Sequence, residues 1–201
     1  MDNICSNIYR FIFSDKEKAK KFLDFVEASN NDNDKGLLYL LSIKANIKNA
    51  TFRDAIKNDK IRDTREQVTY AYFLSDTEIG AMTDSEWSPC PNAWQDIAKT
   101  FDENVIVYYE TEEPDCGIYA SNDPDYISHY IISVSGDSYL PDGFPVDHLN
   151  THEEIISVLQ ELLGTYESDL SALLYILKNS EYGNSVFVHE ITYAAISDWS
   201  L

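Results

Sequence analysis

Carboxylate side chains are concentrated in one stretch of this sequence. They are Asp102, Glu103, Glu110, Glu112, Glu113, Asp115, Asp123 and Asp125. Carboxylates held close together can exchange protons with a substrate or bind a divalent cation. The regular ligand spacing of a calcium loop is missing, which leaves a second interpretation, an acidic surface for a basic partner. Tyr109 and Tyr119 are interleaved with these acids, and tyrosine is enriched in protein interfaces, so we predict that all ten residues bind a partner.

Histidine and cysteine offer two further chemistries, each with a weak pattern. His148 and His152 are four positions apart, a spacing that can place two zinc ligands on one helix face. Thr151 is the expected N-cap of that helix, so His148 falls in the preceding loop, and no third ligand is evident. The three cysteines include no C-x-x-C pair, which indicates free thiols in a reducing cytosol. We expect no metal site and no cofactor.

The glycine pattern gives no support to nucleotide-dependent catalysis. The seven glycines are isolated and form no G-x-G-x-x-G, Walker or G-x-S-x-G motif. A cysteine can still meet His129 or His189 in space, because a nucleophile and its base need not be neighbours in sequence. We predict a non-enzymatic protein without catalytic residues. The alternative is a small metal-dependent or acid–base enzyme built on the Glu110–Asp125 edge.

The elements that position these residues follow from the spacing of apolar side chains. Tyr9, Phe11 and Phe13 recur at every second position, the period of a strand, and Ser14 with Glu17 forms the capping-box pattern of a helix start. The expected order is a strand at 7–13, a helix after it, a helical insert within 30–63, strands at 67–74 and 78–86, a helix at 91–101 and a strand at 105–109. This β-α-β-β-α-β order is the ferredoxin-like split βαβ arrangement and predicts an α+β fold with an antiparallel sheet.

A second group of elements follows. Thr151 and Glu154 form another capping box, and Gly164 is placed to end the helix. A second helix and a strand complete the chain. The predicted division is a ferredoxin-like domain at 1–137, with its helical insert at 30–63, and a helix–helix–strand extension at 138–201. We expect the extension to pack on the same core as the first domain.

Charge is distributed unevenly along the chain. The 35 acidic and 15 basic residues give a formal net charge of −20, and residues 66–201 contain only two basic side chains, Lys99 and Lys178. The 78 residues between those lysines carry 16 carboxylates, the charge of about 27 Å or roughly 8 base pairs of duplex DNA. This balance argues against direct binding of nucleic acid or of an anionic membrane. Two interpretations remain, a surface for a basic partner or negative charge that serves solubility.

Two segments together resemble a known family. Asn3–Asn7 reads Asn-Ile-Cys-Ser-Asn and is followed by a strand and a lysine-rich helix. Ser85–Pro91 reads Ser-Glu-Trp-Ser-Pro-Cys-Pro and precedes a helix that contains Trp94. Over about residues 1–121 the chain resembles the YubB-type ferredoxin-like domain family, small proteins often carried by plasmids, phages and other mobile elements. The resemblance implies an α+β sheet domain and an origin on a mobile element. It implies no catalytic residue and no iron–sulfur cluster.

Charge and resemblance together lead to a functional prediction. The acidic part would occupy the basic groove of a nucleic-acid-binding protein and block it by charge mimicry. For a protein carried on a mobile element, the expected target is a host restriction or CRISPR-type nuclease or effector. Contact through Glu153–Asp169, or through the lysine-rich first helix, is the alternative. The lack of a signal-peptide pattern and of a long apolar run predicts the cytoplasm of a bacterial host.

Overall fold

The computed structural model describes residues 4–29, 37, 41, 44, 66–86, 88–114, 116–135, 140–141, 144–146 and 149–199. The predicted insert at 30–63 lies outside them apart from single positions, as do Asp115 and His148. The described elements are β1 (Ile4–Ile12), α1 (Lys16–Ser29), β2 (Gln67–Phe73), β3 (Glu78–Glu86), α5 (Pro91–Lys99), β4 (Ile106–Glu113), β5 (Ile118–Ser121), β6 (Tyr130–Val134), β7 (Leu149–Asn150), α6 (His152–Leu163), α7 (Leu170–Lys178), β8 (Val186–Glu190), β9 (Thr192–Tyr193) and the 3-10 helix η1 (Ile196–Asp198). Together they form an α+β fold, as the sequence predicts.

The chain divides into two compact units. Unit 1 contains residues 1–123 and 193–201, and unit 2 contains residues 124–192. Each unit has its own cluster of buried apolar side chains. The domain boundary predicted after residue 137 lies inside unit 2, beyond the end of β6. Helices α6 and α7 bury their apolar side chains in the cluster of unit 2, with β6 and β8, and not in the cluster that α1 and α5 cover.

Unit 1 is built on a six-stranded sheet with the order β2-β3-β1-β4-β5-β9. Strand β1 lies between β3 and β4 and pairs antiparallel with both, and β2 pairs antiparallel with β3. This is the split βαβ arrangement expected from the β-α-β-β-α-β order, with β5 and β9 added beside β4. Because β1 is central, its alternating side chains lie on both faces of the sheet, between those of β3 and β4.

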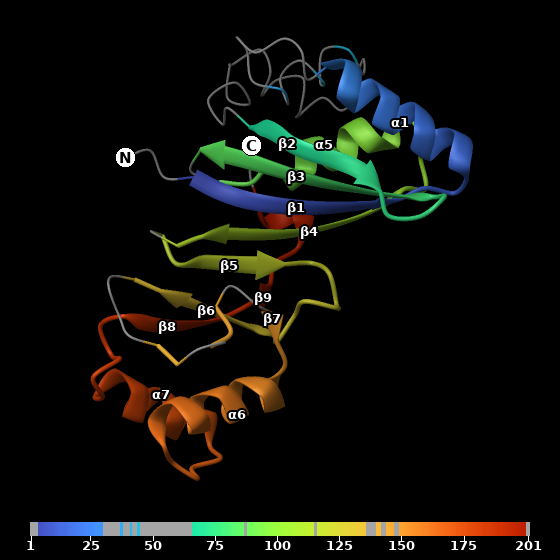
Figure 1. Ribbon diagram of the computed structural model, residues 1–201. Helices are drawn as coiled ribbons and strands as arrows, with labels where there is room; N and C mark the ends of the chain where they lie inside the picture. The colour runs from blue at the N-terminus through green and yellow to red at the C-terminus, as the bar shows by residue number, and fades with distance from the viewer. Residues whose placement is uncertain are drawn as a thin grey trace. The chain divides into compact units, whose positions relative to one another are not determined.

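Helices α1 and α5 cover one face of this sheet (Figure 1). Alternation along β1 directs Tyr9 and Phe11 into the interface, where both are fully buried. Trp94 of α5 contacts the two rings, with centroids 5.6 and 5.8 Å away. Aromatic side chains bury a large apolar area, and tilted ring pairs add stabilisation beyond that area. The covered face therefore holds the sheet together and leaves the opposite face for other contacts.

The start of α1 differs from the predicted capping box. Asp15, not Ser14, accepts a hydrogen bond from the backbone N–H of Lys18, at 2.9 Å. The N–H of Ser14 instead donates to Asp102 Oδ2 at 2.7 Å. A helix start leaves N–H groups that need acceptors, and here a distant aspartate supplies one of them. A long-range contact has replaced the local motif that the sequence suggested.

Unit 2 contains a three-stranded antiparallel sheet with the order β7-β6-β8, against which α6 and α7 pack. The predicted capping box of α6 is confirmed, because Thr151 and Glu154 each accept a hydrogen bond from the backbone N–H of the other. Gly164 ends the helix with φ of 61°, a left-handed conformation that glycine adopts without strain. Leu159 and Leu173, one from each helix, are fully buried in the cluster of this unit.

Candidate functional site

The face of the unit 1 sheet opposite α1 and α5, which we call the open face, carries exposed apolar side chains. Ile4 and Ile8 of β1, Met82 of β3 and Ile106 of β4 are 40–55% exposed. Ile8 stands directly opposite Met82 on one neighbouring strand and Glu110 on the other. Apolar side chains gathered on an exposed sheet face are typical of a contact surface for another molecule.

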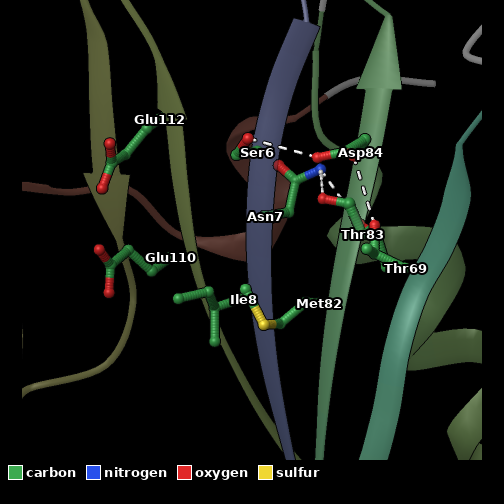
Figure 2. A pocket seen from close by; sticks show the side chains of 9 residues that line it. All are labelled: Ser6, Asn7, Ile8, Thr69, Met82, Thr83, Asp84, Glu110 and Glu112. Carbon is green, nitrogen blue, oxygen red and sulfur yellow. Dashed lines mark hydrogen bonds between the residues drawn. The ribbon is translucent and has the colours of Figure 1, made fainter.

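A pocket of about 170 Å³ lies on the open face, and we call it the open-face pocket. Its lining residues are Ser6, Asn7, Ile8, Thr69, Met82, Thr83, Asp84, Glu110 and Glu112. Figure 2 shows Glu110 and Glu112 on one side of β1 and Asp84 on the other. The described lining thus combines apolar side chains with three carboxylates and includes no basic side chain.

Glu110 has the least solvated carboxylate of this pocket. The residue is 6% exposed, and its Oε2 has no hydrogen-bond partner among the described residues. Burial raises the pKa of Glu110 to about 8, and repulsion by Glu112 and Asp123 adds to the rise. A buried carboxylate that receives no hydrogen bond is costly to ionise. The open-face pocket therefore presents a group that a cation would stabilise.

Asp84 is oriented on the other side of the pocket by two hydroxyl groups. Ser6 and Thr69 each donate a hydrogen bond to its carboxylate, both at 3.3 Å (Figure 2). The register of β1 with β3 places Ser6 directly opposite Asp84. These bonds come from the strands on either side of β3, so they fix the direction of an otherwise exposed carboxylate.

Beneath the pocket, a buried hydrogen-bond network fixes β1 against its neighbours. Asn7 accepts a bond from the hydroxyl of Thr111 at 2.7 Å and donates to the hydroxyl of Thr83 at 3.2 Å. The Thr83 hydroxyl donates to Glu66 Oε1 at 2.6 Å, and Nε1 of Trp94 donates to the same oxygen at 2.8 Å. Burial raises the pKa of Glu66 to about 7, and these two hydrogen bonds limit the rise. The network joins β4, β1 and β3 to α5 and holds the strands that line the pocket in register.

The structure places the predicted partner-binding residues in very different environments. Those that are buried, at 1–6% exposure, are Asp102, Tyr109, Glu110, Glu113, Tyr119 and Asp123. Glu103 and Asp125 are exposed, and Glu112 is half-buried. Asp115 lies outside the described residues. These acids are therefore not one exposed surface, because most of the described ones lie inside unit 1.

Two of the buried aspartates hold unit 1 together. Asp102 accepts hydrogen bonds from the N–H of Ser14 at 2.7 Å and from the ammonium of Lys18 at 3.1 Å. The backbone bond from Ser14 is the main reason that the pKa of Asp102 stays well below its usual range. Asp123 pairs with the guanidinium of Arg10 at 2.8 Å. Their charges are paired within the fold, so both residues stabilise unit 1.

The enzyme alternative requires a metal site, a nucleophile–base pair or an acid–base pair of carboxylates. None of the described His, Cys, Asp and Glu side chains gather in threes to hold a metal ion. All cysteines belong to unit 1 and all histidines to unit 2, so neither unit contains a cysteine–histidine pair of its own. Burial raises the pKa of Cys5 to about 12, which disfavours its thiolate. Alternation along β4 sends Glu113 to the helix-covered face, away from Glu110 and Glu112.

Unit 2 carries the largest excess of negative charge. Its eleven acidic residues are accompanied by a single basic one, Lys178. The exposed acids that the structure describes, which we call the unit 2 acidic surface, are Asp125, Glu153, Glu154, Glu161, Asp169, Glu181 and Glu190. Tyr166, in the segment between α6 and α7, is 99% exposed, and Tyr175 of α7 is 72% exposed. This unit therefore combines a large excess of acidic residues with exposed aromatic rings.

Unit 2 also contains a hollow of about 370 Å³, lined in part by Tyr130, His152, Asp169 and Glu190. The Tyr130 hydroxyl and His152 Nδ1 lie 3.3 Å apart. Asp169 caps α7 by accepting a hydrogen bond from the N–H of Ala172 at 2.8 Å. Because these polar groups stabilise the unit itself, we take the open-face pocket and the unit 2 acidic surface as the candidate sites.

Comparison with known proteins was made for the whole chain. No protein-family model matches it, and neither the curated proteins nor the solved structures give a match. The resemblance to the YubB-type family therefore stays a prediction. Among the described helices, none is long and apolar enough to cross a membrane.

Sequence reasoning missed Ser6, Ile8 and Asp84 as residues of one pocket. The available signal was the second face of β1, where isoleucine recurs at positions 4, 8 and 12 and so points away from the core. Which residues of β3 and β4 stand beside that face depends on strand register. Register is set by pairing between distant segments, and one sequence does not reveal it.

Proposed function

We propose that the protein is a non-enzymatic interaction protein whose unit 2 acidic surface binds a basic protein. The observation that carries this proposal is the ratio of eleven acidic residues to one basic residue in unit 2. Exposed charges of one sign produce a field that reaches about 10 Å into 0.1 M salt. Such a field accelerates the approach of a cationic partner and repels an anionic one.

In unit 1, by contrast, exposed lysines pair with exposed aspartates. Lys16 of α1 pairs with Asp76 at 2.7 Å, and Lys20 pairs with Asp24 at 2.8 Å. Exposed pairs of this kind add little stability, but they cancel the local field. Unit 2 itself contains one basic residue for such pairs, Lys178, and this supports the binding of a basic partner.

Exposed tyrosine supports an interface over a purely solubilising surface. Tyr166 lies between α6 and α7, a segment that also contains Asp169, and Tyr175 lies in α7, which is followed by Glu181. A tyrosine ring buries a large area at a low entropic cost and keeps a polar hydroxyl, which is why tyrosine is frequent at binding hot spots. Solubility alone needs the charges and gains nothing from the rings.

We propose further that the partner is a nucleic-acid-binding protein, which the acidic surface blocks by charge mimicry. Grooves that bind phosphate backbones are the protein surfaces richest in lysine and arginine, so they fit this surface best. If the gene travels on a mobile element, as the resemblance implies, the partner is a host restriction or CRISPR-type nuclease or effector and the protein is its inhibitor.

A matched pair of double variants tests the proposed surface. Glu161→Lys with Glu181→Lys reverses two exposed charges of unit 2, one near a helix end and one in a turn. Glu27→Lys with Glu103→Lys makes the same change in unit 1, also near a helix end and in a turn. Each bait is incubated with a bacterial lysate at about 50 mM and about 500 mM salt, a range over which screening of surface charge increases strongly. Captured proteins are then identified, and their release of labelled DNA is measured on addition of each bait.

We expect the wild-type protein and the unit 1 variant to capture a nucleic-acid-binding protein at low salt and to displace its DNA. The unit 2 variant should lose about tenfold or more in this activity, because each reversed charge replaces an attraction by a repulsion. Equal losses for both variants would mean that only net charge matters, which contradicts a defined surface. Capture that is unchanged at high salt, or that leaves DNA bound, would contradict charge mimicry.

A further inference from the structure

The buried carboxylate of Glu110 in the open-face pocket is not explained by the fold of unit 1. The residue is 6% exposed, and its Oε2 has no hydrogen-bond partner among the described residues. An unsatisfied buried carboxylate destabilises the folded state, whereas an aliphatic or amide side chain of similar size would not. Side chains that lower the stability of the folded state are expected at sites where a protein binds a ligand or a partner.

The residues that line the pocket indicate which kind of cation could contact Glu110. Ile8 lies between Glu110 and the β3 side of the pocket, where Met82 is half-exposed and Asp84 is held by hydroxyl groups. Two strand spacings and an offset of two residues along β1 separate Asp84 from Glu110, about 12 Å between their backbones. A single small ion cannot reach both carboxylates. A long side chain can cover the apolar residues with its methylene groups and place its charged end against Glu110.

Two residues further along β1, the same face of the sheet already binds a guanidinium group of the chain itself. Arg10 lies two residues from Ile8 on β1, on the same face. Its guanidinium carbon stands 4.9 Å from the ring centroid of Tyr108, and one of its nitrogens pairs with Asp123 at 2.8 Å. The β1 residue that pairs with Glu110 is Ile8, and its side chain carries no charge. The described residues thus provide an arginine beside Tyr108 and provide no cation beside Glu110.

We propose that the open-face pocket binds an arginine side chain of a protein partner, with its guanidinium against Glu110 and its methylene groups over Ile8 and Met82. Arginine fits better than lysine because its planar fork donates two parallel hydrogen bonds to a carboxylate and is more weakly hydrated. The inference deepens the proposed function, since it rests on a basic partner. It adds a specific contact in unit 1 to the long-range field of unit 2.

Short peptides test the pocket without a known partner. The full chain, labelled with ¹⁵N, is titrated with acetyl-Gly-Arg-Gly-amide and followed by amide chemical shifts. Matched peptides replace arginine by citrulline, which keeps the shape and removes the charge, or by lysine, which keeps the charge and removes the fork. We expect the arginine peptide to shift amides at Ser6, Ile8 and Asp84, the citrulline peptide to have no effect, and the lysine peptide to bind several-fold more weakly.

Two variants of equal charge decide whether Glu110 is responsible. Glu110→Gln should weaken binding of the arginine peptide about tenfold, the size of one charge-assisted hydrogen bond. Glu103→Gln removes the same charge from an exposed position outside the pocket and should leave binding unchanged. Since Glu110→Gln also relieves a buried charge, unfolding would not account for its loss. Shifts confined to unit 2, equal binding of the citrulline peptide, or equal effects of both variants would each overturn the inference.

The unit 2 variant separates this inference from the proposed function. Glu161→Lys with Glu181→Lys should abolish capture of the basic partner while the arginine peptide still shifts the amides of the open-face pocket. If wild-type protein captures no basic partner and the peptide still binds, the proposed function is wrong and the pocket stands. If the partner is captured and the peptide leaves the pocket unshifted, the pocket is wrong and the function stands.

Discussion

The substitution Glu110→Gln should stabilise unit 1, and the gain should grow with pH. Glutamine keeps the size and shape of the side chain and removes the charge that the pocket leaves unsatisfied. Most substitutions of buried residues destabilise a protein, so a gain in stability would be a specific signature of a buried carboxylate without donors.

The magnitude follows from the difference between the folded and unfolded pKa values. Burial raises the pKa of Glu110 from 4.5 to about 8, with repulsion from Glu112 and Asp123 as the lesser causes. Because the folded value is the higher one, wild-type stability is complete below about pH 4.5 and falls as the pH rises towards 8. Each pKa unit corresponds to about 1.4 kcal/mol, so the loss is at most about 5 kcal/mol above pH 8. The other charged groups around Glu110 are Arg10, which Asp123 already engages, and Asp84 on the far side of β1.

Urea unfolding followed by tryptophan fluorescence measures this difference in the right part of the chain, because all three tryptophans belong to unit 1. Wild type, Glu110→Gln and the exposed control Glu103→Gln are compared at about pH 4, below the unfolded pKa, and at about pH 8.5, above the raised folded pKa. We expect the free energy of unfolding of Glu110→Gln to exceed that of wild type by about 1.5 kcal/mol or more at the higher pH and to match it closely at the lower one. The control should follow wild type at both.

A gain of equal size at both pH values would refute the reasoning, because desolvation of a charge acts only where the charge exists. A loss of stability at pH 8.5 would refute it more strongly. That result would mean that the carboxylate of Glu110 receives stabilising hydrogen bonds in solution, and the pocket would then have no unsatisfied group to offer a ligand.

Three further predictions concern the polar contacts that support the two units. Asp102→Asn should lower the free energy of unfolding by about 2 kcal/mol at pH 7, because the N–H of Ser14 loses an ionised acceptor. The pKa of Asp102 is held low in the folded state, so this difference should shrink as the pH falls below about 4, measured by urea unfolding. Glu66→Ala should cost about 3 kcal/mol and change the emission of Trp94, whose Nε1–H would lose its buried acceptor. Thr151→Ala should cost about 1 kcal/mol by removing the capping box of α6, and hydrogen exchange of the α6 amides should report it while unit 1 stays unchanged.

Local patterns predicted most of the elements and the strand order of unit 1. The two-residue period that contains Tyr9 and Phe11 identified β1 and its buried face, and the order of strands and helices then restricted the topology to a few arrangements. Helix α6 was predicted with its cap because Thr151 and Glu154 stand three positions apart, within reach of each other's backbone. Such signals depend on neighbours in sequence, which a single chain displays in full.

The division into units was not readable in the same way. Strand β6 is visible as an apolar segment, but its partners are β7 and β8, and β8 lies more than fifty residues further along the chain. Packing and loop closure determine strand pairing over such a separation, and local propensity carries no information about either. A boundary placed by composition therefore fell inside the second sheet.

The same limit explains why the acidic stretch was interpreted as one surface. Counting charges cannot separate a carboxylate used inside the fold from one that faces solvent. Asp102 meets the N–H of Ser14 from 88 positions away, and Asp123 meets Arg10 across the sheet. Both contacts depend on tertiary structure, so only coordinates could remove these residues from the predicted interface. The partner-binding charge that we propose therefore lies in unit 2 and in the open-face pocket.

Two buried glutamates of unit 1 differ in the hydrogen bonds that their carboxylates receive. Glu66 is enclosed by the core, and its Oε1 accepts hydrogen bonds from Thr83 and Trp94. Removing it would leave donors buried without an acceptor, so the fold needs it. Glu110 is nearly as buried, yet its Oε2 receives no hydrogen bond among the described residues, and it lines a pocket that opens to solvent. No donor among the described residues would be lost with it, and its charge weakens the fold increasingly as the pH rises towards 8. A carboxylate that destabilises its own unit is explained when the donor comes from another molecule, and the apolar residues beside it favour the side chain of an arginine.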